Sequence, residues 1–336
     1  MIEAAAGFVL VLLLIALRVP VAVAMGLVGA LGLWWIWGPA SLGFVLGKAP
    51  FDAIATPSLA IVPLFVMMGV FAARGGLSRS LYEAARAFLG HRRGGLALAT
   101  VGASALFGAI CGSSLATAAT IGKVAMPEMR RAGYPHTLAA ASVAAGGTLG
   151  VMIPPSVLFV VYGLMTEQSI GKLFAAGLLP GLSGMLLYMA AVRLSTRRGL
   201  AAAVAPRLSW RERLATLARI WQTALLLLLV LVGMYAGLFT PSEAAAVGAA
   251  GALFLTWLNG QLTLATLRDG LVETVLTTAM IFAILIGAAI FNAFVDATGI
   301  ARVVIDRVAA VGADPLLVLL ALALLYITLG CLMDSL

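Results

Sequence analysis

Two short segments of this sequence combine residue types that could bind a small ion within an otherwise apolar chain. They are Gly108–Thr120 and Ala145–Ser156. Pro154 and Pro155 in the second segment have no N–H donor, so a helix must break there and leave carbonyl oxygens without partners. In transporters, broken helices of this kind offer carbonyl oxygens to Na⁺ and helix N-termini to anions. We therefore expect an ion or substrate site at these segments.

Hydroxyl side chains in the same segments could supplement the carbonyl oxygens. The candidates are Ser113, Ser114, Thr148 and Ser156. Na⁺ is a hard cation, so a set of neutral oxygen ligands suits it. For the first segment close helix packing is an alternative, because Gly and Ser let two helix backbones approach each other.

The sequence lacks the motifs typical of soluble enzymes. Its only histidines are His91 and His136, which do not form an H-E-x-x-H pair. Gly122-Lys123 lacks the other residues of a phosphate-binding loop, and no G-x-S-x-G motif occurs. Few acids lie inside the apolar stretches, so a membrane-embedded enzyme is disfavoured as well. We predict that the protein is not an enzyme.

Composition indicates what kind of scaffold must position the two segments. The chain has 336 residues, of which 63% are hydrophobic and 10% are charged. Soluble domains carry about 25% charged residues, so this chain could not cover a water-soluble globule with polar surface. We predict a multi-pass, all-α membrane protein. The net charge of +8 follows from the positive-inside rule rather than from nucleic-acid binding, and the arginine-rich stretch 193–219 is expected in the cytoplasm.

Local signals divide the chain into membrane segments. Apolar segments lie near 4–17, 19–37, 54–73, 95–111, 137–166, 170–192, 218–238, 242–259, 271–295 and 316–333. The first two are separated by a break at Arg18-Val19-Pro20. Segment 95–111 is short and precedes small polar residues, which favours a re-entrant hairpin.

Capping-box patterns at Ser209–Glu212 and Thr240–Glu243 predict two helix starts, and the second makes a tight hairpin of 218–238 and 242–259.

A weak internal repeat relates residues 71–113 to residues 294–335. The matched pairs are Phe71/Phe294, Gly76/Gly299, Leu77/Ile300, Arg79/Arg302, Glu83/Asp306, Gly108/Gly330 and Ser113/Ser335. Such repeats are typical of secondary transporters. The chain ends where the second repeat reaches its serine turn, so we expect it to be shorter than its full design.

The predicted regions are N-terminal scaffold spans (1–50), a first repeat forming the transport domain (51–192), a basic loop with a scaffold hairpin (193–270) and an incomplete second repeat (271–336).

Nine motifs, in order along the chain, resemble the large membrane subunit, of the DctM type, of tripartite ATP-independent periplasmic (TRAP) transporters. They are Gly90–Ala97, Phe107–Ser114, Ile121–Met129, Gly133-Tyr134, Leu149–Ser156, Ser169–Phe174, Ala176–Gly181, Phe239–Ala246 and Gly330–Asp334. The resemblance implies an ion-transporter-like fold of two inverted repeats, each with a re-entrant hairpin and a broken helix. It also implies an elevator movement of a transport domain against a scaffold.

The same resemblance implies a function. It implies sodium-coupled import of small organic acids (carboxylates) across the bacterial inner membrane. The expected partners are a periplasmic solute-binding protein, a small four-helix membrane subunit and membrane lipid, with no nucleic acid. It implies no cofactor other than the coupling ion Na⁺.

The resemblance also extends the candidate site. The expected sodium- and substrate-binding residues are Gly112, Ser113, Ser114, Thr117, Gly147, Thr148, Gly150, Ile153, Pro154, Pro155 and Ser156. Na⁺ would be held in the region of Ser113, Thr148 and Pro155, and Asp334 and Ser335 would belong to the equivalent site of the second repeat. Family members continue past Met333-Asp334 with a second hairpin arm and a second Pro-Pro loop, so half of the family's site is expected to be missing here.

Three alternatives remain open at this stage. The chain could be a sodium-coupled carboxylate carrier of the same fold that works without a binding protein. It could be a transport-inactive fragment. It could also be a passive channel or scaffold; uptake that does not depend on a sodium gradient would distinguish a channel from a carrier.

Overall fold

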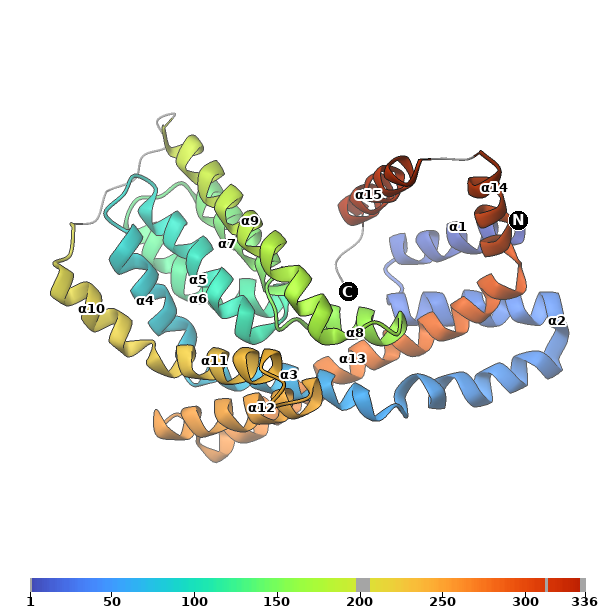
Figure 1. The fold of residues 1–336 in the computed structure, drawn as a ribbon, viewed down its shortest axis with the longest axis horizontal. Helices are drawn as coiled ribbons and strands as arrows, with labels where there is room; N and C mark the ends of the chain where they lie inside the picture. Colours follow the sequence, from blue (N-terminus) through green and yellow to red (C-terminus); the bar gives the residue numbers. More distant parts are fainter. Residues whose placement is uncertain (1, 198–205, 312–313, 333–336) are drawn as a thin grey trace. The chain divides into compact units, whose positions relative to one another are not determined.

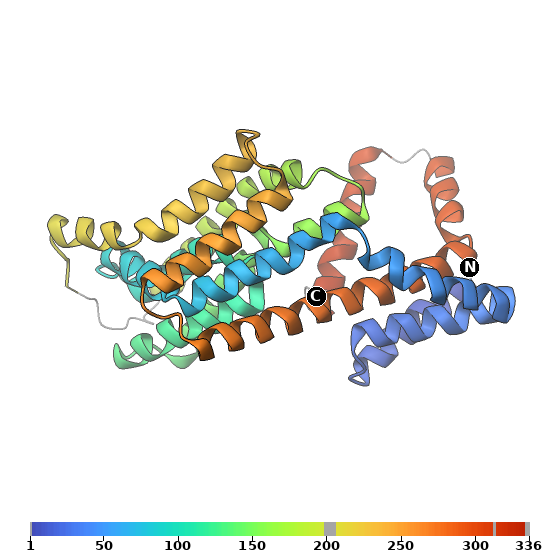
Figure 2. The same cartoon turned by 90° about the horizontal axis from the view of Figure 1, so that it is seen from below.

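The computed structural model describes residues 2–197, 206–311 and 314–332, and its regular structure there is entirely helical. This confirms the predicted all-α class. The chain divides into two compact units, one made of residues 1–57 with 278–336 and the other of residues 58–277. Figures 1 and 2 show the helices from two directions.

The first unit joins the N-terminal helices to the C-terminal part of the chain. Its helices are α1 (Ile2–Ala16), α2 (Val21–Ile54), the part of α13 (Leu264–Ala297) after residue 277, α14 (Ile300–Val311) and α15 (Pro315–Leu332). The predicted break between the first two helices is confirmed, and Arg18 has a positive φ of 67° there. Near residue 37, where an apolar segment was expected to end, the chain kinks at Gly38 and continues as a helix. Val28, Leu33, Phe291 and Phe294 are buried in its core.

The second unit contains the candidate site. A short 3₁₀ turn (Pro57–Ala60) lies at the boundary where this unit begins. Its helices are α3 (Ile61–Arg74), α4 (Leu77–Leu89), α5 (Gly95–Cys111), α6 (Ser114–Arg131), α7 (His136–Met152), α8 (Val157–Met165), α9 (Ile170–Arg197), α10 (Trp210–Arg219), α11 (Trp221–Tyr235), α12 (Pro241–Leu258) and the start of α13. Helices α5, α6 and α7 pack against one another, and α9 packs against α5 and α7.

Both predicted capping boxes are present. The Ser209 and Thr240 hydroxyl oxygens accept hydrogen bonds from the amides of Glu212 and Glu243. In return, the two glutamates accept hydrogen bonds from the backbone amides of Ser209 and Thr240. Each box satisfies amides that a helix start leaves without partners. Helices α11 and α12 pack together as the predicted hairpin.

The order of elements agrees with the proposed internal repeat. Helices α3 and α4 are joined at Gly76, and α13 and α14 at Gly299, with positive φ angles of 80° and 66°. Helices α5 and α15 then follow in equivalent places. Asp334 and Ser335, the expected second-repeat site, lie outside the described residues. The four sequence-based regions stay a prediction.

Three described helices are long and apolar enough to cross a membrane, and up to six spans result if each bent helix pair counts as one. The three are Val21–Asp52, Ile170–Thr196 and Leu264–Ala297.

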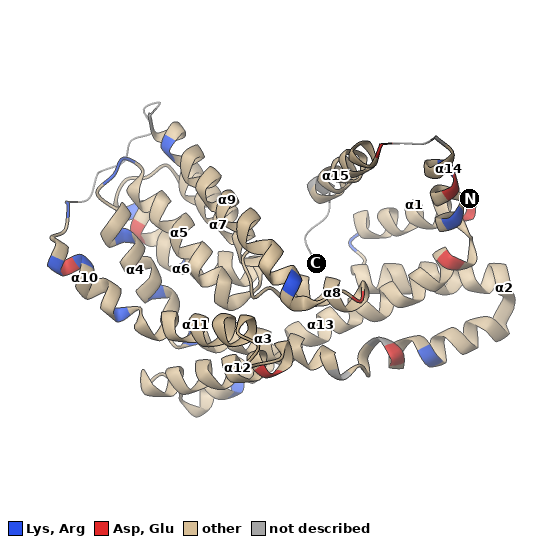
Figure 3. Cartoon of the chain, in the orientation of Figure 1, with Lys and Arg blue, Asp and Glu red and all other residues tan. Residues whose placement is uncertain are grey.

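In the second unit, helices α5 and α7 carry no Lys, Arg, Asp or Glu, whereas charges gather on α4, α10 and the loops beside them (Figure 3). The unit thus has an uncharged interior around the candidate site.

Candidate functional site

The first part of the site is a turn between two antiparallel helices. Helix α5 ends at Cys111, and the Gly112 that caps it has a φ of 63° and an amide that donates to the Gly108 carbonyl oxygen at 2.8 Å. Ser113 is extended and is the N-cap of α6, since its hydroxyl accepts a hydrogen bond from the Ala116 amide at 3.4 Å. A left-handed residue followed by an extended one reverses the chain in two residues. The sequence-predicted hairpin therefore exists, and its relation to a membrane stays a prediction.

The second part is the predicted break in a long apolar segment. The last amide of α7 to bond in helical register is that of Ile153, which donates to the Leu149 carbonyl oxygen at 3.0 Å. Pro154 and Pro155 would be the next donors, for Gly150 and Val151, but proline has no N–H. Helix α8 starts after Ser156, and its axis is bent by 41° from that of α7. The break is confirmed, and it removes the helical partners of two carbonyl oxygens.

The hairpin turn and the helix break contact each other directly. The Val157 amide donates a hydrogen bond to the Gly112 carbonyl oxygen, with an N···O distance of 3.3 Å. A β-carbon on Gly112 would lie 2.9 Å from the Pro155 carbonyl oxygen and 3.1 Å from the Val157 nitrogen. No side chain fits between these two backbones, so glycine is required at this position. The structure thus brings together two segments that the sequence marked independently.

Further glycines let the two helices come close just before the break. A β-carbon on Gly150 would lie 2.5 Å from the Thr117 hydroxyl oxygen and 2.7 Å from the Ser113 carbonyl oxygen. One turn earlier, a β-carbon on Gly147 would lie 3.2 Å from the Ser114 carbonyl oxygen. The end of α7 therefore packs on the start of α6 through backbone and hydroxyl oxygens.

Two hydroxyl groups of this region are buried without ordinary hydrogen bonds. Ser156 Oγ and Thr117 Oγ1 are both buried and have no partner of standard geometry among the described residues. Thr117 lies beside the Cys111 thiol, which is a weak hydrogen-bonding group. Buried polar groups normally have hydrogen-bond partners, so these two hydroxyls are candidate ligands for a bound ion.

Thr148 and Ile153 face away from this contact. The Thr148 hydroxyl donates to the Ala145 carbonyl oxygen at 2.8 Å and lies 3.1 Å from the hydroxyl of Tyr188 on α9. Ile153 is buried in an apolar core that also contains Leu149. The structure does not bring the Thr148 hydroxyl to the hairpin turn, although the sequence placed it in the sodium site.

Sequence reasoning missed three groups of this region. The Val157 amide joins the two turns, Tyr188 engages Thr148, and Ser104 Oγ is a further buried hydroxyl without a partner. A β-carbon on Gly146 would lie 2.6 Å from Ser104 Oγ. The one available signal for Ser104 is that it and Thr100 are the two hydroxyl residues of the apolar helix α5, and nothing local marks Tyr188.

The chemistry available at the contact is that of neutral oxygen atoms. Within residues 2–197, 206–311 and 314–332, no three His, Cys, Asp or Glu side chains come together as metal ligands. Carbonyl and hydroxyl oxygens from Ser113, Thr117, Pro155 and Ser156 would suit a hard monovalent cation with modest affinity. Without a charged ligand, such a site can release its ion, which a coupled transporter requires.

Comparisons with known proteins agree with the sequence motifs. Residues 8–336 match the family described as the DctM component of the tripartite ATP-independent periplasmic transporter. A C4-dicarboxylate TRAP transporter large permease protein of Pseudomonas aeruginosa is 37% identical over 92% of this chain and 72% of its own length. An isethionate TRAP transporter permease protein of Oleidesulfovibrio alaskensis is 35% identical over 96% of this chain.

The chain spans 51% of the length of the Oleidesulfovibrio protein and 54% of that of a related large permease of Vibrio cholerae. The Vibrio protein is 37% identical over 74% of this chain and is named a C4-dicarboxylate TRAP transporter large permease protein. These relatives are transporter permeases and not enzymes, as the sequence predicted for this chain. Nearly the whole chain matches one family model, and it therefore belongs to the DctM component family of tripartite ATP-independent periplasmic transporters.

Proposed function

We propose that the protein is the membrane-embedded large subunit of a sodium-coupled transporter that imports small organic acids. The observation that carries this proposal is the backbone contact between the hairpin turn and the helix break, from Val157 N to Gly112 O. A hairpin turn and a helix break that meet in this way bring backbone carbonyl oxygens together within an apolar region. Membrane proteins tolerate such backbone where it is buried in protein or lines a cavity that binds a ligand.

Sodium is the proposed coupling ion because of the oxygen atoms around this contact. The proposed ligands are carbonyl oxygens at Ser113 and Pro155 and the hydroxyls of Thr117 and Ser156. Both hydroxyls are buried; Ser156 Oγ has no partner among the described residues and Thr117 Oγ1 lies beside the Cys111 thiol alone, so a cation could bind both oxygen atoms. Gly112, Ser114, Gly147, Gly150 and Pro154 shape the same contact. Thr148 would join only after releasing Tyr188.

Small organic acids are the proposed substrates. Relatives are named for C4-dicarboxylate, isethionate, sialic acid and 2,3-diketo-L-gulonate. A carboxylate can be bound by hydroxyls and by the amides of a helix N-terminus, and the start of α8 follows the break directly. The choice among these acids is proposed to rest largely with a periplasmic solute-binding protein.

The proposed mechanism is an elevator movement in the bacterial inner membrane. Helices α5, α6 and α7 approach each other through glycines such as Gly108 and Gly150, so this part of the chain packs tightly enough to move as one body. A small four-helix membrane subunit is the proposed stationary partner. The relatives are named as TRAP transporter permeases, which supports a TRAP system over a carrier that works alone.

Uptake measurements test this proposal. The complete permease, its small subunit and its binding protein would be reconstituted in proteoliposomes with a labelled C4-dicarboxylate outside. An inward sodium gradient should drive accumulation, whereas an equal potassium gradient should not. Accumulation that is indifferent to sodium would refute the coupling, and equal uptake without the binding protein would favour the stand-alone carrier.

A further inference from the structure

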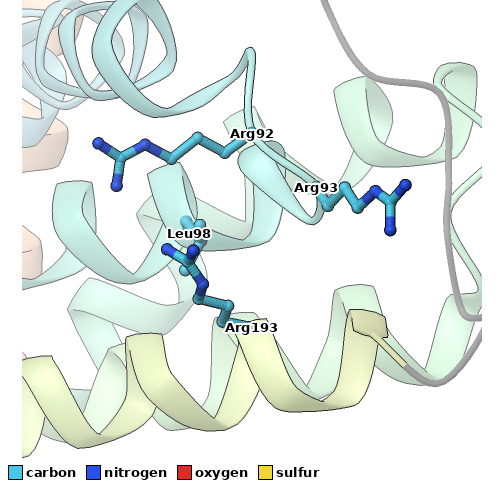
Figure 4. Close-up of a pocket in the computed structure, with 4 residues that line it drawn as sticks. All are labelled: Arg92, Arg93, Leu98 and Arg193. Atoms are coloured by element: carbon cyan, nitrogen blue, oxygen red, sulfur yellow. The ribbon is translucent and has the colours of Figure 1, made fainter.

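A hollow of about 460 Å³ at one end of the second unit is lined by three arginines and one leucine. Arg92 and Arg93 come from the loop between α4 and α5, and Arg193 comes from the last turns of α9. Figure 4 shows Arg92 and Arg193 extending near Leu98, whereas Arg93 extends to the other side. Leu98 is buried and lies one turn into α5. The hollow thus combines an apolar wall with guanidinium groups from two distant parts of the chain.

No acid balances these arginines in the described part of the chain. The ion pairs of the second unit among described residues use Arg74, Arg86 and Arg131 instead. The neighbouring sequence 198–205 contains no Asp or Glu. The pKa of His91, in the same loop, is lowered by desolvation and by the positive charges of Arg213, Arg207 and Arg92. The positive-inside rule requires basic loops, but it does not require unbalanced arginines around a hollow.

An exposed apolar stripe leads along α9 to the hollow. Leu179, Leu182 and Leu186 are 77%, 47% and 60% exposed. They precede Arg193 by fourteen, eleven and seven residues, which places all four on one face of the helix. At ~1.5 Å per residue the stripe is about 21 Å long, and the acyl chains of one leaflet reach roughly 15 Å into the membrane. The stripe therefore covers the depth of one leaflet.

From this combination we infer that the arginine hollow binds the phosphate of an anionic phospholipid, whose acyl chains lie along the leucine stripe of α9. Arg92 and Arg193 would hold the phosphate by charge-assisted hydrogen bonds, and Arg93 would add to the local positive potential. A soluble organic acid or inorganic phosphate would use the arginines but would gain nothing from the leucines. The charge and the stripe together favour a lipid.

Native mass spectrometry of the purified chain tests the inference. The probes are phosphatidylglycerol and phosphatidylcholine with identical palmitoyl-oleoyl chains, offered at equal concentration. Phosphatidylglycerol should remain bound, and phosphatidylcholine should not. The Arg92→Gln/Arg193→Gln variant should weaken phosphatidylglycerol binding by roughly thirtyfold, because each arginine near an anionic headgroup contributes on the order of a fivefold effect.

A matched variant and two soluble probes decide between sources of the phosphate. Arg211→Gln/Arg268→Gln removes the same charge from exposed positions that do not line the hollow, and it should leave binding unchanged. Leu182→Ala/Leu186→Ala should weaken phosphatidylglycerol binding and leave that of glycerol 3-phosphate or inorganic phosphate unaffected. Equal retention of both lipids, an equal loss in the matched variant, or tight binding of either soluble probe would overturn the inference.

Discussion

The carbonyl oxygen of Gly112 accepts a hydrogen bond from the amide of Val157, so the turn of one helical hairpin is joined to the break in another helix. The bond runs between two backbones that have no room for a side chain, since Gly112 faces the Pro155 carbonyl oxygen. A displacement of either turn therefore moves the other. An ion bound by oxygen atoms of both turns would hold the hairpin turn and the helix break in a fixed position relative to each other. Binding of the ion would then depend on the geometry of both.

Gly112→Ala should be strongly destabilising. The residue has a φ of 63°, and a β-carbon would lie 2.9 Å from the Pro155 carbonyl oxygen. The left-handed backbone alone costs about 1 kcal/mol with alanine, and the close contact should add on the order of 1–3 kcal/mol. Thermal unfolding in detergent measures the loss, and sodium-driven uptake should fall with it.

Gly133→Ala is the control for that substitution. Gly133 also has a positive φ, of 76°, but a β-carbon there would meet no atom within 4 Å. It should therefore show the backbone cost alone, about 1 kcal/mol. Equal losses in the two variants would mean that the Gly112 contact is not as tight as described.

Ser156→Ala should weaken sodium binding without weakening the fold. The Ser156 hydroxyl is buried and unpaired among the described residues, so its removal eliminates an unsatisfied polar group and should be neutral or slightly stabilising. If the hydroxyl is a sodium ligand, the sodium concentration for half-maximal uptake should rise severalfold. The control is Ser142→Ala, because Ser142 is equally buried but donates to the Leu138 carbonyl oxygen. An unchanged sodium requirement in Ser156→Ala would remove this residue from the site.

Thr148→Ala should leave the sodium requirement unchanged. Its hydroxyl bonds with Tyr188 rather than with the hairpin turn, so its loss should cost about 1 kcal/mol of stability. Tyr188→Phe should cost a similar amount, and the double variant should lose less than the sum of both. A raised sodium requirement in Thr148→Ala would instead support the assignment made from the sequence.

Acid should loosen the contact between α10 and α4. The Arg213 guanidinium lies over the rings of Phe88 and Trp210 and donates to His91 Nδ1 at 3.3 Å, which requires neutral His91. The pKa of His91 is lowered by desolvation and by Arg213, Arg207 and Arg92. Because folding lowers the pKa of His91, the stabilisation from this hydrogen bond is fully present above the ordinary histidine pKa of about 6.5. It is lost as the pH falls from there through the lower pKa of the folded state.

Hydrogen exchange of α10, corrected for intrinsic rates, measures this loosening. Protection should decrease between pH 7 and pH 5 in the unaltered chain. His91→Gln keeps a hydrogen-bond acceptor that does not titrate, so its protection should not depend on pH over this range. A decrease of the same size in His91→Gln would assign the effect to another group.

Local signals in the sequence predicted the interruptions of this fold well. Pro154-Pro155 and Arg18-Val19-Pro20 break helices where expected, whereas the single prolines Pro127 and Pro180 lie inside α6 and α9. The helix start at the Thr240–Glu243 capping box was likewise predicted from a pattern of four neighbouring residues. The kink at Gly38 was missed, since the helix that follows contains Lys48, Asp52 and two prolines and does not read as an apolar span.

The contact at the centre of the site could not be predicted from spacing. Gly112 and Val157 are joined only because α6 and α7 fold back on each other, and no periodicity in the sequence specifies that packing. Thr148 shows the same limit. A hydroxyl near a helix break is a reasonable ligand from its type, but its direction depends on α9, where Tyr188 takes it up.

A sodium titration of thermal unfolding tests the central claim most directly, because the proposed site lies entirely within residues 58–277 of this chain. The purified protein would be unfolded in detergent at increasing NaCl, with KCl keeping the ionic strength constant. The account predicts a stabilisation by sodium that rises with the logarithm of its concentration above the dissociation constant and reaches about 1.4 kcal/mol at ten times that constant. It also predicts that Ser156→Ala shifts the curve to higher sodium. Coincident unfolding curves in NaCl and KCl would contradict a sodium site at the contact between Gly112 and Val157.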